Sequence, residues 1–143
     1  MKTVKQLLAS KFIPSVWSIS PETTTYDAIK ILADKGIGAL PVMQGDELVG
    51  VFSERDYARK VILKGKSSLD TPVREIMSTD VVTVNPNQSN EECMQLMTDK
   101  RIRHLPVLDN GKLIGVLSIG DLVKDIISEQ QAVIEQLEHY IHG

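Results

Sequence analysis

Two nine-residue stretches decide the fold of this chain: LVGVFSERD at residues 48–56 and LIGVLSIGD at residues 113–121. They lie 65 residues apart, and the same offset aligns residues 16–62 with 81–127 without a gap, giving 14 identities in 47 pairs. The alignment includes the tripeptides LPV at 40–42 and 105–107. Similarity at a fixed period is typical of units that cannot bury an apolar face alone. We therefore predict two copies packed as a pseudo-twofold pair.

Each copy predicts the element order strand, helix, strand, strand, helix. Short strands are expected at 16–19 and 81–84, each ended by a turn at Ser-Pro or Asn-Pro. A core-facing helix should follow, because Thr24 with Asp27, and Ser89 with Glu92, have the spacing of an N-cap hydroxyl and an N3 carboxylate.

The second half of each copy predicts a hairpin and then a helix. Apolar runs at 39–43 and 47–52 flank Gln-Gly-Asp, and those at 105–108 and 112–117 flank Asp-Asn-Gly. The last helix continues as an apolar stripe without Gly or Pro until Gly143, so it is expected to exceed 20 residues and to pack on a partner. A short helix is expected before the first copy, around Val4, Leu7 and Leu8.

Composition limits the class of protein. A chain of 143 residues can bury one sizeable core, and its net charge of -3 gives no general attraction to nucleic acid. No run reaches the roughly 20 apolar residues of a membrane span. Cys93 is the only cysteine, which fits a reducing compartment, so the expected location is the cytoplasm.

The paired motifs resemble the cystathionine-beta-synthase (CBS) domain family, as a tandem pair of the small stand-alone bacterial type called a Bateman module. The resemblance rests on GALPV at 38–42, LVGVFSERD at 48–56 and their second-copy equivalents. It implies an α/β (α+β) fold of two β-α-β-β-α repeats with an N-terminal helix and a long C-terminal helix. Repeat 1 with the N-terminal segment would span 1–65, a linker 66–72, and repeat 2 with the helical extension 73–143.

The resemblance also implies a non-catalytic regulatory or sensor module. Family members bind AMP, ADP, ATP, S-adenosylmethionine or NAD(H) in two clefts between the repeats. The expected partners are thus an adenine nucleotide, a second copy in a homodimer and an unidentified regulated protein. A ligand-independent dimerisation or protein-interaction scaffold is the alternative.

The motif Ser-x-x-Asp has two interpretations in both copies. Ser53 and Ser118 could cap the following helices, with Asp56 and Asp121 closing a capping box. The same geometry suits a nucleotide, because a helix N-terminus attracts phosphate and a carboxylate can accept both hydroxyls of a ribose.

Each cleft implied by the family joins one copy's second strand to the other copy's Ser-x-x-Asp. Cleft one would contain Trp17, Ile37, Gly38, Ala39 and Pro41 with Val116, Ser118, Gly120 and Asp121. Cleft two would contain Val82, Ile102, Arg103, His104 and Pro106 with Val51, Ser53, Arg55 and Asp56. Aliphatic side chains would hold adenine, and the two aspartates would hold ribose.

The two clefts differ in charge. Arg55, Arg103 and His104 in cleft two favour charged phosphates, unless Arg103 and His104 form a solvated strand edge. In cleft one, Gly120 replaces the family's usual polar residue, which indicates either a bulkier ligand or a weakened site. Trp17 could stack on a ligand there, or it could belong to the core or surface.

The sequence offers no catalytic constellation. Cys93 lies on an apolar helix face, where a buried thiol is expected, and His139 with His142 make only two potential metal ligands near a chain end. No phosphate-binding glycine loop or CxxC motif is present. We therefore expect neither an enzyme nor a metal site.

Overall fold

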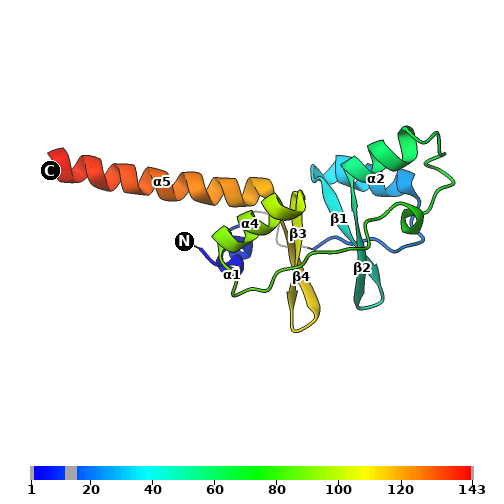
Figure 1. Cartoon of the computed structure of the whole chain (residues 1–143), viewed down its shortest axis with the longest axis horizontal. Helices are drawn as coiled ribbons and strands as arrows, with labels where there is room; N and C mark the ends of the chain where they lie inside the picture. The colour runs from blue at the N-terminus through cyan, green and yellow to red at the C-terminus, as the bar shows by residue number, and fades with distance from the viewer. Residues whose placement is uncertain (1, 12–15, 143) are drawn as a thin grey trace. The chain divides into compact units, whose positions relative to one another are not determined.

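The computed structural model describes residues 2–11 and 16–142, which divide into two compact units. One unit comprises 16–82, and the other joins the N-terminal residues to 83–143. Figure 1 shows that each unit contains a two-stranded hairpin and a preceding helix. The repeat of helices and strands and the long last helix confirm the predicted fold class.

The first long helix of each copy begins at the predicted cap. Helix α2 (Thr25–Lys35) is capped by Thr24, and α4 (Asn90–Lys100) begins with a capping box between Ser89 and Glu92. Each helix ends at a residue in the left-handed conformation, Gly36 in the first copy and Arg101 in the second. The caps satisfy backbone N–H groups that a helix cannot pair internally.

The hairpins confirm the turn prediction. Strand β1 (Ala39–Gln44) pairs antiparallel with β2 (Glu47–Ser53), and β3 (His104–Asp109) pairs with β4 (Lys112–Ser118). The registers of the two hairpins match position by position, including a bulge after Val42 and Val107. Both central turn residues of the second hairpin, Asn110 and Gly111, have positive φ, as a tight hairpin turn requires.

The expected first strand of each copy is reduced to a single parallel bridge. Ile19 pairs with Val42 through two backbone hydrogen bonds, from Ile19 N–H to the Pro41 carbonyl and from Met43 N–H to the Ile19 carbonyl. A parallel ladder extended to Trp17 would need an N–H from Pro41, which proline lacks. Pro106 imposes the same limit beside the equivalent bridge of Val84 with Val107.

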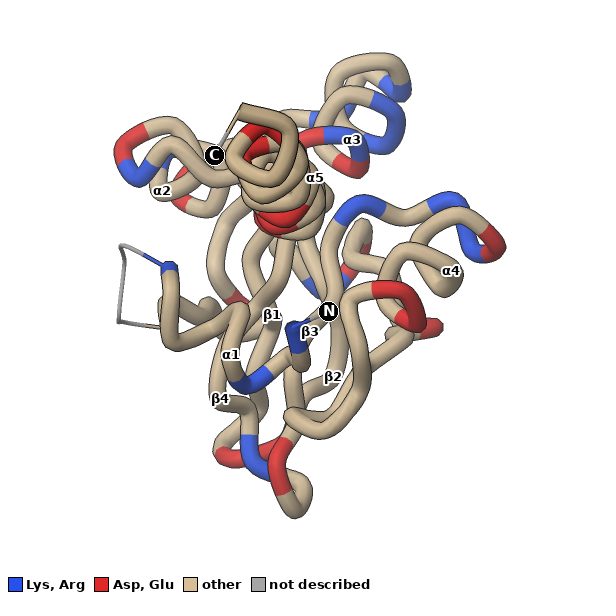
Figure 2. The backbone as a smooth tube through the Cα atoms, turned by 90° about the vertical axis from the view of Figure 1, so that its left-hand side faces the viewer, with Lys and Arg blue, Asp and Glu red and all other residues tan. Residues whose placement is uncertain are grey.

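The second helix differs between the copies. In the first copy, α3 (Glu54–Tyr57) passes into a π-helical segment, η1 (Ala58–Ile62). In the second copy, α5 (Ile119–His142) continues for 24 residues, which confirms the predicted long helix. Figure 2 views α5 nearly along its axis and shows acidic residues in its turns. None of the helices in the described ranges has the length and apolarity that a membrane crossing requires.

Each hairpin packs against a segment that precedes the other repeat. Helix α1 (Val4–Ala9), capped by Thr3, contacts β4 and α5. In the other unit, the 3-10 helix η2 (Val73–Glu75) and the residues after it reach β2, where Val51 and Ser78 exchange backbone hydrogen bonds. The equivalent glycines Gly50 and Gly115 allow these close approaches, to Met77 and Leu8 respectively.

Each unit has its own apolar core beneath the hairpin. The core of the first copy includes Phe52, Leu40 and Leu32, and it is completed by Val73 and Ile76 from the segment around η2. In the other unit, fully or nearly fully buried side chains come from all its elements: Val4, Leu7, Val84, Cys93, Met97, Leu105, Val107, Leu117 and Leu122. Burial of this apolar area is the main driving force for each unit.

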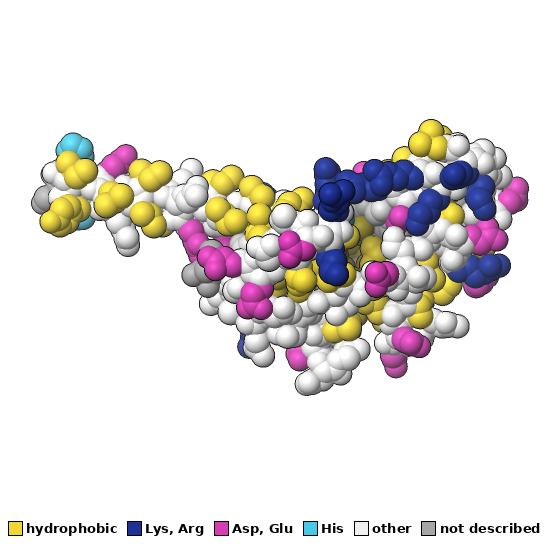
Figure 3. Space-filling view, viewed as in Figure 1, with side chains coloured by type: hydrophobic (Ala, Val, Ile, Leu, Met, Phe, Trp, Pro, Cys, Tyr) yellow, Lys and Arg dark blue, Asp and Glu magenta, His cyan; other side chains and the backbone are white. Residues whose placement is uncertain are grey.

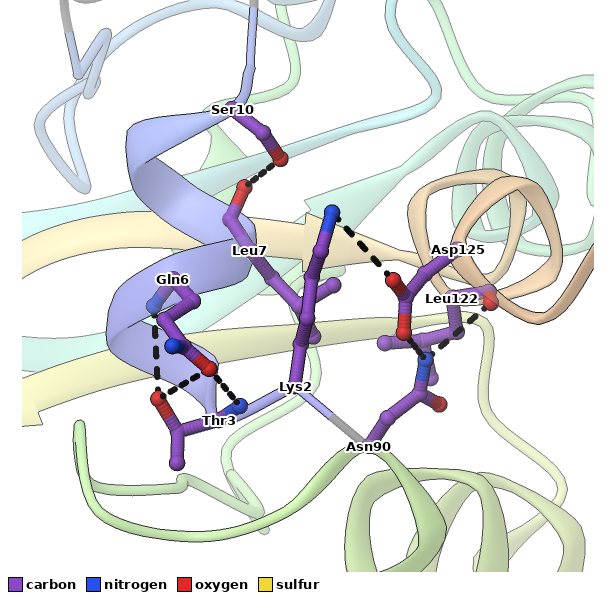
Figure 4. A network of polar contacts seen from close by, with 8 residues as sticks. All are labelled: Lys2, Thr3, Gln6, Leu7, Ser10, Asn90, Leu122 and Asp125. Carbon is purple, nitrogen blue, oxygen red and sulfur yellow. Dashed lines mark hydrogen bonds and ion pairs between the residues drawn. The ribbon is translucent and has the colours of Figure 1, made fainter. Parts of the chain in front are cut away.

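A buried polar network connects the N-terminal segment to α4 and α5 (Figure 4). Asn90 Nδ2 donates to Asp125 Oδ2 at 2.8 Å and to the Leu122 carbonyl at 3.2 Å. Lys2 Nζ lies 3.5 Å from Asp125 Oδ1. Because Asn90 and Asp125 are buried, these contacts fix how α5 leaves the unit.

Candidate functional site

Ser53 and Asp56 form a closed polar cluster at the junction of β2 and α3. Ser53 Oγ accepts from the Asp56 N–H at 3.1 Å, while Asp56 Oδ2 accepts from the Ser53 N–H and hydroxyl, both at 3.0 Å. Asp56 Oδ1 accepts from Ser78 Oγ at 3.4 Å and pairs with Lys60 Nζ at 3.4 Å. Both carboxylate oxygens are therefore engaged within this unit, and Asp56 is only 8% exposed.

The equivalent cluster at the start of α5 is more open. Asp121 Oδ2 accepts from the Ser118 N–H at 2.8 Å and pairs with Lys11 Nζ at 2.9 Å, and Ser118 Oγ accepts from the Asp121 N–H at 3.2 Å. The Asp121 side chain is 23% exposed. Among the described residues, the Asp121 carboxylate makes its hydrogen bond and its ion pair through Oδ2, so Oδ1 retains capacity to accept hydrogen bonds.

Both clusters have the capping geometry that the sequence predicts. The hydroxyl of each serine and the carboxylate of each aspartate satisfy the backbone N–H groups of the first helical turn, as in a capping box. The capping interpretation is thereby confirmed. A carboxylate that caps a helix can still accept a ribose hydroxyl at a free lone pair, so capping does not exclude the ribose interpretation. That interpretation stays a prediction.

A lysine stands beside each aspartate, and neither lysine is among the predicted site residues. Lys60 follows Asp56 by four residues, a spacing that brings opposite charges together on a helix, and its Nζ also donates to the Ile76 carbonyl at 3.1 Å. Lys11 donates to the Val116 carbonyl at 2.7 Å across 105 residues of sequence. The i,i+4 spacing could have identified Lys60, whereas no local pattern identifies Lys11.

His104 lies at the start of β3, opposite Ser118 in the hairpin register. Burial lowers the pKa of its imidazole, the charges of Lys11 and Arg103 lower it further, and Asp121 partly opposes them. The imidazole is therefore mostly neutral at pH 7. The positive charge predicted for cleft two consequently depends on Arg55 and Arg103, both of which are exposed.

The structure brings together site residues of the same copy. Residue 39 faces Ser53 and His104 faces Ser118 across the hairpins, while the Gly38 and Arg103 carbonyls accept from the first N–H groups of α3 and α5. Unit 16–82 holds Trp17, Ile37, Gly38, Ala39, Pro41, Val51, Ser53, Arg55, Asp56 and Val82. The other unit holds Ile102, Arg103, His104, Pro106, Val116, Ser118, Gly120 and Asp121. The clefts that would combine residues of both copies stay a prediction.

Three further side chains have defined surroundings. Trp17 is half-buried against the core of its unit, with Lys35 Nζ 4.8 Å from its ring centroid, a cation–π geometry. Burial raises the pKa of Cys93 to about 11, which keeps the thiol protonated and unreactive. Within residues 2–11 and 16–142, no three His, Cys, Asp or Glu side chains gather in a way that would hold a metal ion.

Comparison with known proteins identifies the repeats. The family model for the CBS domain matches residues 4–63 and 73–128. A mitochondrial CBS domain-containing protein of Arabidopsis thaliana, CBSX3, is 42% identical over 127 residues, covering 85% of this chain but only 62% of its own length. The CBS domain-containing protein YhcV of Bacillus subtilis is 35% identical over 132 residues, covering 92% of this chain and 91% of its own.

Solved structures show the same fold. A protein with CBS domains from Burkholderia ambifaria is 53% identical and superposes with a TM-score of 0.87 over 90% of this chain and 96% of its own. A CBS domain pair solved in complex with 5′-methylthioadenosine and S-adenosyl-L-methionine superposes with a TM-score of 0.76 at 22% identity, over 90% of this chain and 98% of its own. The matched repeats, their hairpins and their Ser-x-x-Asp helix starts thus have one explanation: the chain belongs to the CBS domain family, as a tandem pair.

Proposed function

We propose that the chain is a regulatory module that binds an adenine nucleotide (AMP, ADP, ATP or NAD(H)) or another adenosine derivative, S-adenosylmethionine. The observation that carries this proposal is the cluster of Ser118, Asp121 and Lys11, in which a partly exposed carboxylate and an ammonium group stand side by side. The carboxylate would accept ribose hydroxyls, and the ammonium would attract phosphate. An adenosine group is also common to the two ligands of the solved CBS pair described above.

The two aspartates differ in the capacity of their carboxylates to accept a ribose hydroxyl. Asp121 can accept a first ribose hydroxyl at Oδ1 without losing the contacts made by Oδ2. Asp56 would have to give up Lys60 or Ser78, because both its oxygens are engaged. We therefore propose that the Asp121 site fills at the lower ligand concentration, while Arg55 and Arg103 favour phosphate-rich ligands at the Asp56 site.

The proposed output is a conformational change read by another protein, in a homodimer and without catalysis. A ligand can shift such an equilibrium only by binding one state more tightly than the other. The proposed compartment is the cytoplasm, because a buried thiol such as Cys93 persists there in its reduced form.

A thermal-shift series with AMP, ADP, ATP, NAD, NADH and S-adenosylmethionine tests this function. A ligand at about 100 times its dissociation constant should add roughly 2.7 kcal/mol to the free energy of unfolding. The variant Ser118→Ala with Asp121→Asn should lose the shift, and Glu91→Gln, an exposed acidic position on α4, serves as the matched control. The absence of a shift with all six compounds would overturn the nucleotide proposal.

The alternative function is a ligand-independent interaction scaffold. One observation favours it: both Ser-x-x-Asp motifs are already satisfied as helix caps, so neither requires a ligand for stability. Under this alternative, the oligomeric state should be the same with and without nucleotide. Mass spectrometry should detect no adenosine compound released from the purified protein.

A further inference from the structure

Helix α5 extends beyond the unit on which it packs. Leu122 and Asp125 are buried against the unit, but every residue from Gln131 to His142 is exposed (Figure 1). An isolated helix of about 12 residues is marginally stable in water. The overhanging half is therefore a stretch of marginal length whose residues are all exposed within its own unit.

The exposed apolar side chains of α5 follow a heptad repeat. Positions at alternating intervals of four and three residues form one seam: Val123, Ile127, Gln130, Ile134, Leu137 and Ile141. Isoleucine occupies each a position, and valine, glutamine and leucine occupy the d positions. Ile127 is 50% exposed, Ile134 53% and Ile141 72%. Figure 3 shows hydrophobic side chains along the helix up to its far end.

The residues flanking this seam favour one orientation of two such helices. One flank, the e positions, carries Lys124, Gln131 and Glu138, and the other, the g positions, carries Ile126, Val133 and Tyr140. In a parallel pair, e faces g, so Lys124 and Glu138 would face apolar side chains. In an antiparallel pair, e faces e and g faces g. Lys124 then faces Glu138 of the partner copy, and the apolar flanks cover each other.

One register satisfies all these pairings together. With Ala132 level with its counterpart, Val123 packs on the partner copy's Ile141, Ile127 on Leu137, and Gln130 on Ile134. On the flanks, the same register brings Lys124 within two positions of the partner copy's Glu138, and Val133 within two positions of the partner copy's Val133. The helix is thus complementary to a second, inverted copy of itself in both its apolar pattern and its charge.

We propose that α5 forms an antiparallel two-stranded coiled coil with α5 of a second copy, centred at Ala132. This inference deepens the proposed homodimer and does not depend on nucleotide binding. The polar Gln130 would weaken the seam and fix its register, as a single polar core residue does in other coiled coils.

Charge reversal tests the orientation. Lys124→Glu and Glu138→Lys should each raise the dimer dissociation constant by about tenfold, because each places two like-charge pairs at the interface. The double variant should restore wild-type affinity. Within one helix these residues are 14 positions apart, so an intramolecular effect cannot produce the rescue. Glu135→Lys, on the outward face of the overhang, is the matched control and should leave the constant unchanged.

Cysteine pairing provides an independent test. When Ile127→Cys and Leu137→Cys chains carrying different tags are mixed and oxidised, an antiparallel seam gives disulfides only between unlike chains. Like-chain disulfides would instead indicate a parallel pair and overturn the proposal. Cys93 is buried and should not interfere.

Sedimentation of Ile134→Glu separates the possible failures. A monomeric variant of a dimeric wild type supports the coiled coil. A variant that remains dimeric would overturn the α5 interface and leave a homodimer through another surface. A monomeric wild-type chain at all concentrations would overturn both the interface and the proposed homodimer.

Discussion

Lys11 Nζ lies 2.9 Å from Asp121 Oδ2 and 2.7 Å from the Val116 carbonyl oxygen. A residue that follows α1 thus neutralises a carboxylate at the start of α5, at the opposite end of the chain. In the first copy, Lys60 does the same for Asp56 from the next turn of its own helix. The two copies therefore reach a similar charge balance by different routes, one local and one tertiary.

Substitution of Lys11 by Met should separate phosphate from nucleoside binding. We expect lower affinity for AMP, because the cation beside the site is lost, and unchanged or higher affinity for adenosine, because Asp121 Oδ2 loses a competing partner. Isothermal titration with both ligands measures this difference. Lys5→Met, an exposed position on α1, is the control. Equal loss of both affinities would show that Lys11 acts only through the fold.

Asp56→Asn and Asp121→Asn should differ in their cost to stability. Asp56→Asn removes an acceptor from a buried cluster with Ser78 and Lys60, so the free energy of unfolding should fall by about 1–3 kcal/mol. Asp121 is more exposed, and Asp121→Asn should cost less than about 1 kcal/mol while still weakening ribose binding. Urea unfolding and calorimetry measure the two effects. Equal losses of stability would contradict the difference in burial.

His104 should make stability depend on pH. Its pKa in the folded protein is lowered from the usual value near 6.5, mainly by burial, so the unfolded chain binds a proton more readily than the folded chain. The free energy of unfolding should therefore fall as the pH drops through about 6.5 and towards the lower folded-state pKa. Urea midpoints at about pH 7.5 and 5.5 measure this loss, which His104→Gln should reduce. An identical pH dependence in both proteins would assign it to other groups.

Gly50→Ala should be more destabilising than Gly115→Ala. A Cβ at Gly50 would lie 2.6 Å from Met77 Sδ and 3.0 Å from the Ser78 carbonyl oxygen, whereas at Gly115 its nearest neighbours would be side-chain atoms of Leu8, the first at 2.7 Å. Backbone cannot yield as a leucine side chain can, so we expect a loss of about 1–3 kcal/mol for Gly50→Ala and a smaller one for Gly115→Ala.

Gly120→Ala is the control for this pair. A Cβ at Gly120 meets nothing closer than Ser118 Oγ at 3.6 Å, and alanine is the better helix former by up to about 1 kcal/mol. Thermal unfolding of the three variants should therefore give two losses and one small gain. If Gly120→Ala lowered the stability as much as Gly50→Ala, then neither helix propensity nor close approach would explain the difference expected between these glycines.

Local patterns in the sequence were sufficient for most elements of the fold. Ser89 with Glu92 identifies the start of α4, and Asn110-Gly111 identifies the turn between β3 and β4, because both patterns depend on bonds between near neighbours. The first strand of each copy is the exception. Its length depends on whether Pro41 or Pro106 can donate to it, a question of pairing between strands that periodicity does not address.

The candidate site was only partly predictable. The repeat at a 65-residue offset identified Ser53, Asp56, Ser118 and Asp121, because the same residue types recur at the same place in each unit. It could not show that Asp56 is enclosed and Asp121 is partly open, since the difference arises from Ser78, Lys60 and Lys11, which the repeat does not share.

The sequence alone determined the two repeats and the helix caps, because these follow from spacing along the chain, and its paired motifs carried the resemblance to the family. Only the tertiary structure decided that α1 and Lys11 complete the second copy, while the segment around η2 completes the first. The physical reason is that a partly buried charge needs an opposite charge or a hydrogen-bond partner, and an apolar strand face needs an apolar covering segment. Either can come from any distance in the sequence.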